Sequence, residues 1–240
     1  MLKGTLAVPI TESQSKSIRP QSPATEWPLY GIGDVAHHLA LPRSTVKSWV
    51  IGETSTGFQA VIAAADREQR ILSFQNLVEV FFLSSLRKHG VKLPAVRRAI
   101  SYMQEHFHTA RPLFDSSFFT DGHNVFIEQY GRFISASERG QLAMKAVLEQ
   151  YLDRLEFDSN RAPARLFPWS TAKLDSPRIV VIDPGVSFGQ PCISGTRILT
   201  AVIAERFRAG DEIEALAADY QCNANQIEET IRYESRATAA

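Results

Sequence analysis

The segment from Asp183 to Glu234 constrains the fold of this chain more than any other part of its sequence. A loop with two prolines and three glycines, residues 184–195, opens the segment, and three short helical patterns follow at 199–209, 211–220 and 223–235. Gly210 ends the first pattern, and Asp211 and Asn223 are expected to cap the next two helices, because their side chains can accept hydrogen bonds from free amides. The segment predicts a three-helix module of the helix-turn-helix kind.

A second helix-turn-helix pattern lies far upstream, at residues 30–50. The apolar side chains that share one face of its first helix are Val35, Ala36 and Leu39. Pro42 cannot sit inside a helix, so it marks the turn, and Ser44 is expected to cap the second helix, residues 45–50. Two short helices with a tight turn and a polar, basic outer face on the second are typical of DNA-binding units.

Predicted hairpins and helices fill the region between the two units. Residues 58–62 and 70–74 are expected to be strands joined by the charged turn 66–69, where a winged helix carries its wing. A second hairpin is predicted over 116–130, with Asp121-Gly122 as its turn. Helices are predicted from Ser73 or Phe74 to His89-Gly90, from Pro94 to about Phe107, and from a cap at Ser137 to Leu155.

These elements divide the chain into four parts. We expect a flexible tail at 1–28, a winged helix-turn-helix domain with a helical and hairpin extension at 29–157, a linker at 158–177, and the three-helix module at 178–236. Residues 178–182 are a lone strand, which must pair with the first domain or with a second copy of itself. The predicted fold class is mainly α with small β-hairpins (α+β).

Composition excludes several classes of protein. The 240 residues carry a formal net charge of zero, so any DNA site must be local. The two cysteines, Cys192 and Cys222, have neither disulfide nor zinc spacing, which favours a reducing compartment. The longest apolar run, residues 60–65, is too short to span a bilayer. We therefore expect a cytoplasmic protein with no membrane contact and no cofactor.

Residues 30–108, with Tyr-Gly-Ile-Gly-Asp-Val-Ala-His-His-Leu-Ala-Leu-Pro-Arg-Ser-Thr-Val-Lys-Ser-Trp-Val at their start, resemble the MerR family of winged helix-turn-helix regulators. The chain departs from that family in its long N-terminal tail and in having no long coiled-coil helix and no cysteine-rich effector site. The resemblance therefore implies DNA binding and does not imply the sensing of a metal or drug.

Residues 183–234, including the Gly-Thr-Arg-Ile step, resemble the bacterial domain-of-unknown-function family 433. Proteins of that family are commonly antitoxins, similar to the VapB class, encoded beside a PIN-type ribonuclease toxin. The resemblance implies an antitoxin that neutralises such a toxin by direct binding and represses its own operon.

Charge indicates which unit contacts DNA. Residues 80–104 hold five basic side chains and no acidic one, whereas residues 205–240 hold eight acidic and four basic ones. Because clustered cations attract phosphate and an acidic face repels it, the N-terminal unit is predicted to bind DNA. The residues assigned to DNA are Arg43, Ser44, Thr45, Lys47, Ser48, Arg67, Arg70, Arg87, Lys88, Arg97 and Arg98. A solvated turn for Arg67 and Arg70, and a plain exposed helix face for the basic run, are the alternatives.

The acidic C-terminal module is expected to bind protein, either a second copy of the chain or a basic toxin. The residues assigned to that contact are Ile179, Val181, Arg197, Glu212, Glu228 and Glu229. Arg197 has a structural alternative, bonding to carbonyls of its own loop. A second DNA contact in this module is an alternative, because it also holds side chains that can hydrogen-bond to bases: Asn223, Asn225, Gln226 and Arg232. A homodimer is expected, because symmetric dimers usually recognise operators.

The residues do not favour an enzyme. His37 and His38 are adjacent, and His106 and His108 are two apart, whereas a metal site on a helix needs histidines four apart. Cys192 has no evident base near it in the sequence. Two alternatives to the antitoxin remain open: a transcriptional regulator with no toxin partner, and a protein-binding or oligomerisation scaffold without DNA binding.

Overall fold

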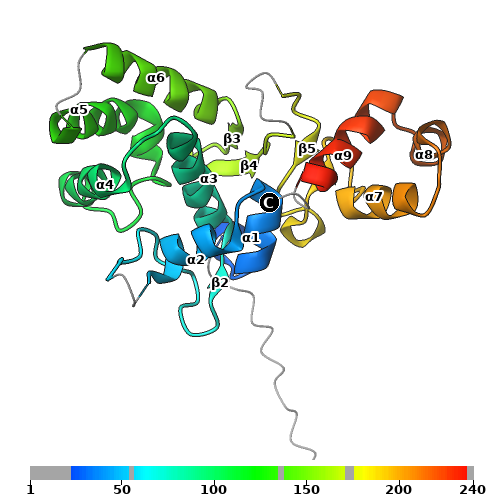
Figure 1. Cartoon of the computed structure of the whole chain (residues 1–240), viewed down its shortest axis with the longest axis horizontal. Coiled ribbons are helices and arrows are strands. Elements are labelled where there is room, and N and C mark those ends of the chain that lie inside the picture. The colour runs from blue at the N-terminus through cyan, green and yellow to red at the C-terminus, as the bar shows by residue number, and fades with distance from the viewer. Residues whose placement is uncertain (1–22, 54–56, 135–137, 171–175, 237–240) are drawn as a thin grey trace, which may run out of the picture.

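The computed structural model describes residues 23–53, 57–134, 138–170 and 176–236. The elements in chain order are η1 (Ala24–Glu26), β1 (Tyr30–Gly31), α1 (Ile32–Leu39), α2 (Arg43–Ile51), β2 (Ile71–Leu72), α3 (Phe74–Lys88), α4 (Leu93–Phe107), the π-helix η2 (Phe118–Gly122), α5 (His123–Ile134), α6 (Glu138–Leu152), β3 (Leu155–Phe157), β4 (Pro163–Leu166), β5 (Val180–Val181), η3 (Ser187–Gly189), β6 (Cys192–Ile193), α7 (Thr200–Arg208), α8 (Ile213–Tyr220) and α9 (Ala224–Arg236). Helices α4–α6 lie at one end of the molecule and α7–α9 at the other, with α1–α3 and the short strands between them (Figure 1). The described strands pair antiparallel in two-stranded sheets. The predicted mainly helical α+β fold is confirmed.

The two helix-turn-helix helices, α1 and α2, form where the sequence predicted them. The Gly31 amide donates to Asp34 Oδ2 at 2.8 Å, which satisfies a free amide at the start of α1. Helix α2 starts at Arg43, because the Pro42 carbonyl already accepts the amides of Thr45 and Val46. Pro42 is therefore the N-cap residue, and the predicted cap at Ser44 is wrong.

The predicted wing hairpin is wrong. Strand β2 pairs with β1, Tyr30 opposite Leu72 and Gly31 opposite Ile71, and not with residues 58–62. Leu72 and Tyr30 are fully buried, so their pairing places both side chains in the core, while Phe58 forms an isolated bridge with Glu53. The charged turn itself is present, because Asp66 and Ile71 bridge and close residues 67–70 into a tight loop.

The second predicted hairpin, at 116–130, is helical. The π-helix η2 runs directly into α5, so Asp121 and Gly122 lie inside a helix. The Phe82 ring of α3 contacts the rings of Phe118 and Phe126 at centroid distances of 5.4 and 5.3 Å. Burial of these rings on α3 outweighs the local turn preference of Asp-Gly. A Cβ on Gly122 would lie 3.0 Å from the Ser117 carbonyl oxygen, tighter than an ordinary contact, so glycine favours the close backbone approach in the π turn.

One hydrophobic core extends past the predicted end of the first domain at 157. Helix α3 crosses its centre, and Leu166, Trp169 and Ile182 belong to it. The predicted linker, 158–177, is wrong for residues 163–170, because β4 pairs with β3 and the side chains that follow are buried. Residues 171–175 lie outside the described residues.

The strand predicted at 178–182 is paired on both sides. Ile182 exchanges two backbone hydrogen bonds with Leu166, of 2.8 and 3.0 Å. The strand therefore pairs with the segment predicted to be a linker, which belongs to the same core as α3. Strand β5 also pairs with β6, a partner nearby in sequence that the pattern did not reveal. Val181 packs against Phe167 and Cys192.

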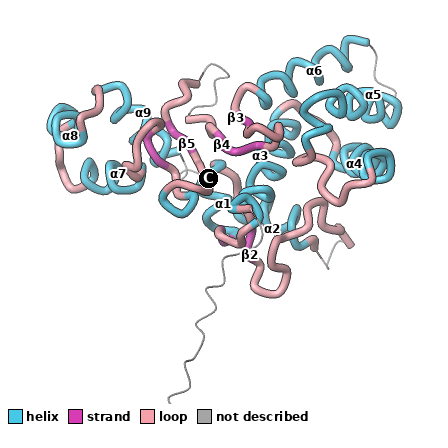
Figure 2. Tube along the Cα trace, turned by 180° about the vertical axis from the view of Figure 1, so that it is seen from behind, coloured by secondary structure: helices cyan, strands magenta, loops and turns pink. Residues whose placement is uncertain are grey.

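Helices α7–α9 enclose a small core of their own, formed by Ile193, Ile203, Leu216 and Ile227. This confirms the three predicted C-terminal helices (Figure 2). Asn223 caps α9 as predicted, since its Oδ1 accepts the Gln226 amide at 2.9 Å. The predicted cap at Asp211 is wrong, because the N-cap residue of α8 is Glu212.

The predicted flexible tail is ordered at its end. Residues 1–22 lie outside the described residues, whereas residues 24–26 form η1, and Glu26 Oε1 accepts a 3.4 Å hydrogen bond from Gln75 of α3. The predicted cap at Ser137 also lies outside the described residues. Among the helices that the structure describes, none is long and apolar enough to cross a membrane.

Candidate nucleic-acid interface

Helix α2 separates an apolar face from a basic one. Val46, Trp49 and Val50 are buried against α1 and α3, while Arg43, Ser44 and Lys47 are exposed. The burial of Trp49 fixes the rotation of α2 about its axis, so its N-terminal turns present their charged side chains to solvent.

Arg43, Ser44 and Lys47 line one surface hollow of about 530 Å³ together with Arg70, which comes from the turn before β2. Gly31 and Ile32 at the start of α1 also line this hollow. Three cations from two separate segments therefore converge at the N-terminal end of α2. A helix start with free amides and converging cations favours phosphate.

The turn that carries Arg70 is held in a strained shape. Arg70 has a φ of +58°, a conformation that costs a non-glycine residue on the order of 1 kcal/mol or more. The Asp66–Ile71 bridge and a 2.9 Å hydrogen bond from the Gln69 amide to Asp66 Oδ1 fix this turn. Arg70, so held, lines the same hollow as Arg43 and Lys47 of α2.

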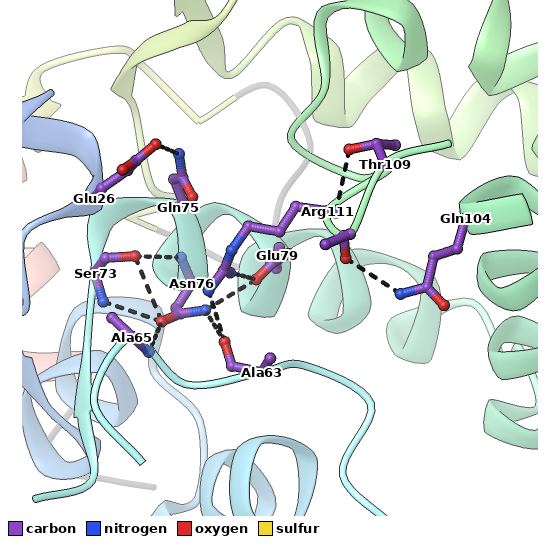
Figure 3. A network of polar contacts seen from close by, with 11 residues as sticks. Glu26, Ala63, Ala65, Ser73, Gln75, Asn76, Glu79, Gln104, Thr109 and Arg111 are labelled. Carbon is purple, nitrogen blue, oxygen red and sulfur yellow. Dashed lines mark hydrogen bonds and ion pairs between the residues drawn. The ribbon is translucent and has the colours of Figure 1, made fainter. Parts of the chain in front are cut away.

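A buried polar network anchors the segment just before that turn (Figure 3). Asn76 of α3 donates to the Ala63 carbonyl at 2.8 Å and accepts the Ala65 amide at 2.9 Å. Arg111 donates to Glu79 Oε2 at 2.8 Å and to the same Ala63 carbonyl at 2.9 Å. Burial raises the pKa of Glu79 to about 7, against the opposing charge of Arg111. The network holds residues 63–65 against α3. These residues directly precede the turn 66–70 that carries Arg70, called the basic turn below.

Thr45 and Ser48 face the protein more than the solvent. The Thr45 hydroxyl accepts a 3.1 Å hydrogen bond from Arg87 Nη1, and the Ser48 hydroxyl donates to the Thr45 carbonyl at 2.9 Å. Both side chains are half-buried. Arg87, which is exposed at the end of α3, is thereby joined to the back of α2.

The remaining predicted cations do not all share the surface of Arg43 and Lys47. Arg97 is half-buried; it donates to the Gln59 carbonyl and lies 4.8 Å over the Phe58 ring, so it ties α4 to the segment after α2. Arg67 lines a different hollow, of about 800 Å³, together with Arg97. Arg98 is exposed on α4, and the side chain of Lys88 lies outside the described residues.

Two residues assigned to protein contacts in the C-terminal module are internal. Glu229 is 5% exposed and accepts a 2.6 Å hydrogen bond from Ser170, so the prediction that it binds a partner is wrong. Val181 is 7% exposed in a paired strand, and the same correction applies to it. Ile179 is half-buried, and its carbonyl accepts the Ser194 amide at 2.7 Å. The exposed members of the set are Arg197, Glu212 and Glu228.

The structure also assigns roles to residues that the sequence did not single out. Side chains of α9 contact α1, and Tyr30 of β1 contacts the loop before β6. His37 and His38, which we considered only as metal ligands, lie at this junction. Their partners are almost 200 positions away in sequence, so no local pattern could have revealed the contact.

Two family models match separate parts of the chain. Residues 28–100 match a family described as a putative DNA-binding helix-turn-helix domain, and residues 180–233 match the family described as protein of unknown function DUF433. We call this matched C-terminal part the DUF433 module. The matched N-terminal segment contains α1, α2, the basic turn, α3 and the start of α4. The DUF433 module contains β5, β6 and α7–α9 almost entirely.

Relatives extend the likeness over most of the chain. A protein of Mycobacterium tuberculosis (strain ATCC 25618 / H37Rv) named "Putative antitoxin VapB45" is 26% identical over 228 residues, covering 85% of this chain and 92% of the relative. An uncharacterized protein of the same organism, Rv2308, is 25% identical over 214 residues, covering 85% and 89%. The crystal structure of Rv2018 from Mycobacterium tuberculosis aligns with a TM-score of 0.66 at 20% identity, covering 86% of this chain and 98% of that one. These findings support a DNA-binding, antitoxin-like role.

Proposed function

We propose that this chain is the cytoplasmic antitoxin of a type II toxin-antitoxin pair, which represses its own operon by binding DNA as a homodimer and neutralises a PIN-type ribonuclease by direct binding. The observation that carries the DNA-binding part is the convergence of Arg43, Lys47 and Arg70 on one hollow at the start of α2. Helix α2 is then the recognition helix, and its first turns enter the major groove.

The DNA surface that we propose is smaller than the charge pattern alone indicated. Arg43, Ser44, Lys47 and Arg70 form this surface. Arg87 lines a different hollow, together with Ser48 and Trp49, and is left out of it. Arg97 serves the protein interior, and we leave it out of the surface. Each phosphate contact that is formed releases counterions, so binding should weaken steeply with salt.

Fluorescence anisotropy with the chain's own upstream DNA and a scrambled duplex, over a salt series, tests this surface. The variant Arg43→Ala/Lys47→Ala is expected to lose at least about 10-fold in affinity and to show a shallower salt slope, because two phosphate contacts are lost. Arg132→Ala is the control, since Arg132 is exposed on α5 and pairs with Glu128. Equal binding of both duplexes by the wild-type protein at every salt concentration would refute DNA recognition.

The toxin-binding part of the proposal rests on the printed name of the relative and on the exposed acidic side chains of the DUF433 module, such as Glu212 and Glu228. A basic ribonuclease is the partner that such a surface favours. If the neighbouring gene encodes a PIN-type ribonuclease, co-expression of the two proteins should give a complex, and Glu212→Lys/Glu228→Lys should weaken it. A stable complex that tolerates both charge reversals would place the contact elsewhere on the chain.

A further inference from the structure

The DUF433 module docks on the helix-turn-helix through a small buried junction between α9 and α1. The Tyr233 hydroxyl and Arg236 Nη2 both donate to the carbonyl of His38, at 3.1 and 2.8 Å. Glu234 Oε2 lies 2.8 Å from His37 Nε2. Figure 1 shows the end of α9 beside α1, although almost the whole chain separates the two helices in sequence.

These contacts act on the weakest point of a short helix. The last carbonyls of a helix have no partner within it, and the His38 carbonyl lies in the last turn of α1. Helix α1 has only eight residues, a length at which helices in water are marginal without tertiary support. The hydroxyl of Tyr233 and the guanidinium of Arg236 satisfy that carbonyl, and the positive charge suits the C-terminal end of a helix.

Glu234 connects the junction to the rest of the module. Its carboxylate accepts hydrogen bonds from His37 of α1 and from Thr200 at the start of α7. Glu234 is 8% exposed, and burial raises the pKa of its carboxyl, but the hydrogen bonds from His37 and Thr200 outweigh this and keep it below its usual value. An ionised and fully bonded carboxylate thus holds α1, α7 and α9 together.

A second contact holds the start of the same unit. The buried Tyr30 hydroxyl donates to the Gly189 carbonyl at 3.1 Å. A Cβ on Gly189 would lie 2.1 Å from the Tyr30 hydroxyl oxygen, so the close approach requires glycine. The module therefore contacts the DNA-binding unit on both sides of α1. Gly31 and Ile32, at the other end of this helix, line the hollow of Arg43 and Lys47.

We infer that the DUF433 module completes the DNA-binding unit: α9 satisfies the His38 carbonyl that the local cap at Ala40 leaves free, and Glu234 is a positioning residue for DNA binding. The inference rests on the proposed DNA-binding function. Loss of the α9 contacts loosens α1, and the cations of α2 then lose the fixed geometry that specific binding requires.

Anisotropy of full-length variants on the upstream DNA tests the inference, and the sign of the change is decisive. Removing a negative charge from a DNA-binding protein should tighten binding by electrostatics alone. We expect the opposite for Glu234→Ala, a loss of about 5-fold or more, the lower end of typical coupling between sites. Glu205→Ala is the control, because Glu205 is exposed on α7 and its loss changes the net charge equally.

A double-mutant cycle separates positioning from general damage. His37→Ala should weaken DNA binding as Glu234→Ala does. The double variant should bind DNA no more weakly than the weaker-binding single variant, because both substitutions remove the same His37–Glu234 contact. Tyr233→Phe, which removes only the hydroxyl at the His38 carbonyl, covers the case in which Glu234→Ala does not fold. If wild-type protein binds its DNA and Glu234→Ala and Tyr233→Phe bind equally well, the inference is overturned. If wild-type protein itself shows no preference, the proposed function fails instead.

Discussion

Individual buried charged side chains hold several segments of this molecule together. Glu79 is 5% exposed, and it keeps its place because Arg111 and Asn76 both donate to it. Removing one member of a buried pair leaves an uncompensated charge, which costs far more than losing an ion pair in water. The network in Figure 3 is therefore held by a few side chains whose individual loss should be severe.

Arg111→Ala should lower the free energy of unfolding by about 1–3 kcal/mol at pH 7.5, because the buried Glu79, whose pKa is already raised to about 7, must then stay unpaired or take up a proton. The loss should shrink in acid, where Glu79 can take up a proton. Urea unfolding at pH 7.5 and pH 5 measures both values. Arg132→Ala, which breaks an exposed pair with Glu128, should cost no more than about 0.5 kcal/mol. Equal losses for the two variants would show that the Glu79 pair is not special.

At the scale of elements, the same residue type has opposite roles in two helices. Gly33 lies in α1, and a Cβ there would meet nothing within 4 Å. Gly122 lies in the π-helix, where a Cβ would meet the Ser117 carbonyl at 3.0 Å. Helix propensity acts alone at the first position, and close backbone approach decides at the second.

Gly33→Ala should therefore stabilise the protein by about 0.5–1 kcal/mol, as expected for a helix without steric conflict. Gly122→Ala should destabilise it, because the Ser117 carbonyl must move. Thermal and urea unfolding of both variants under identical conditions compare the two signs. A gain in stability for Gly122→Ala would contradict the steric explanation of the π turn.

The helices could be predicted from sequence to a degree that the strands could not. Periodic apolar residues indicated α1–α4, α6 and the three helices of the DUF433 module. The Asp121-Gly122 pair led to the wrong prediction of a hairpin at 116–130. The region is helical because Phe118 and Phe126 pack on the distant Phe82, a contact that a local turn signal cannot reveal. The pairing of β2 with β1 depends on burial of Tyr30 and Leu72, which are 42 positions apart, so it too is non-local.

Only part of the candidate site could be predicted from the sequence. Arg43, Ser44 and Lys47 could be assigned from the pattern of one helix, because periodicity fixes which side chains face away from the core. The internal role of Arg97 and the burial of Glu229 depend on tertiary partners, the Gln59 carbonyl and Ser170. Charge counting along the sequence cannot distinguish a solvated side chain from one that is bonded inside.

At the scale of the whole molecule, the junction between α9 and α1 should make stability depend on pH. His38 is 4% exposed, and burial lowers its pKa to about 4, reinforced by the charge of His37. The other charged groups facing it are Asp34 on α1, and Glu234 and Arg236 on α9. In the described part of the chain neither ring nitrogen of His38 has a hydrogen-bond partner, so protonation introduces a charge that nothing neutralises by direct contact.

The lowered pKa of His38 determines how stability changes with pH. The unfolded chain binds this proton first, so stability is lost as pH falls from about 6.5 to about 4, by up to about 3 kcal/mol. His38→Phe keeps a ring against Tyr30 and should lose this part of the acid sensitivity. Urea unfolding from pH 7.5 to pH 4 compares the two proteins, and parallel curves would exclude His38 as the titrating group.

His37 should act in the opposite direction. Its hydrogen bond to Glu234 raises its pKa, so the stability that it contributes is present in acid and is lost as pH rises through the folded value. His37→Ala should therefore be most costly at low pH, and the same titration series measures this.

The cap that α9 provides also determines when the molecule can be finished during synthesis. Residues 30–38 leave the ribosome first, and the side chains that complete α1 belong to residues 233–236, near the end of the chain. Contacts of such sequence separation form late, and domains otherwise tend to fold in the order of their synthesis. A nascent or prematurely terminated chain would carry α1 and α2 without this support. The contact restricts the finished DNA-binding unit to chains whose synthesis has passed residue 236.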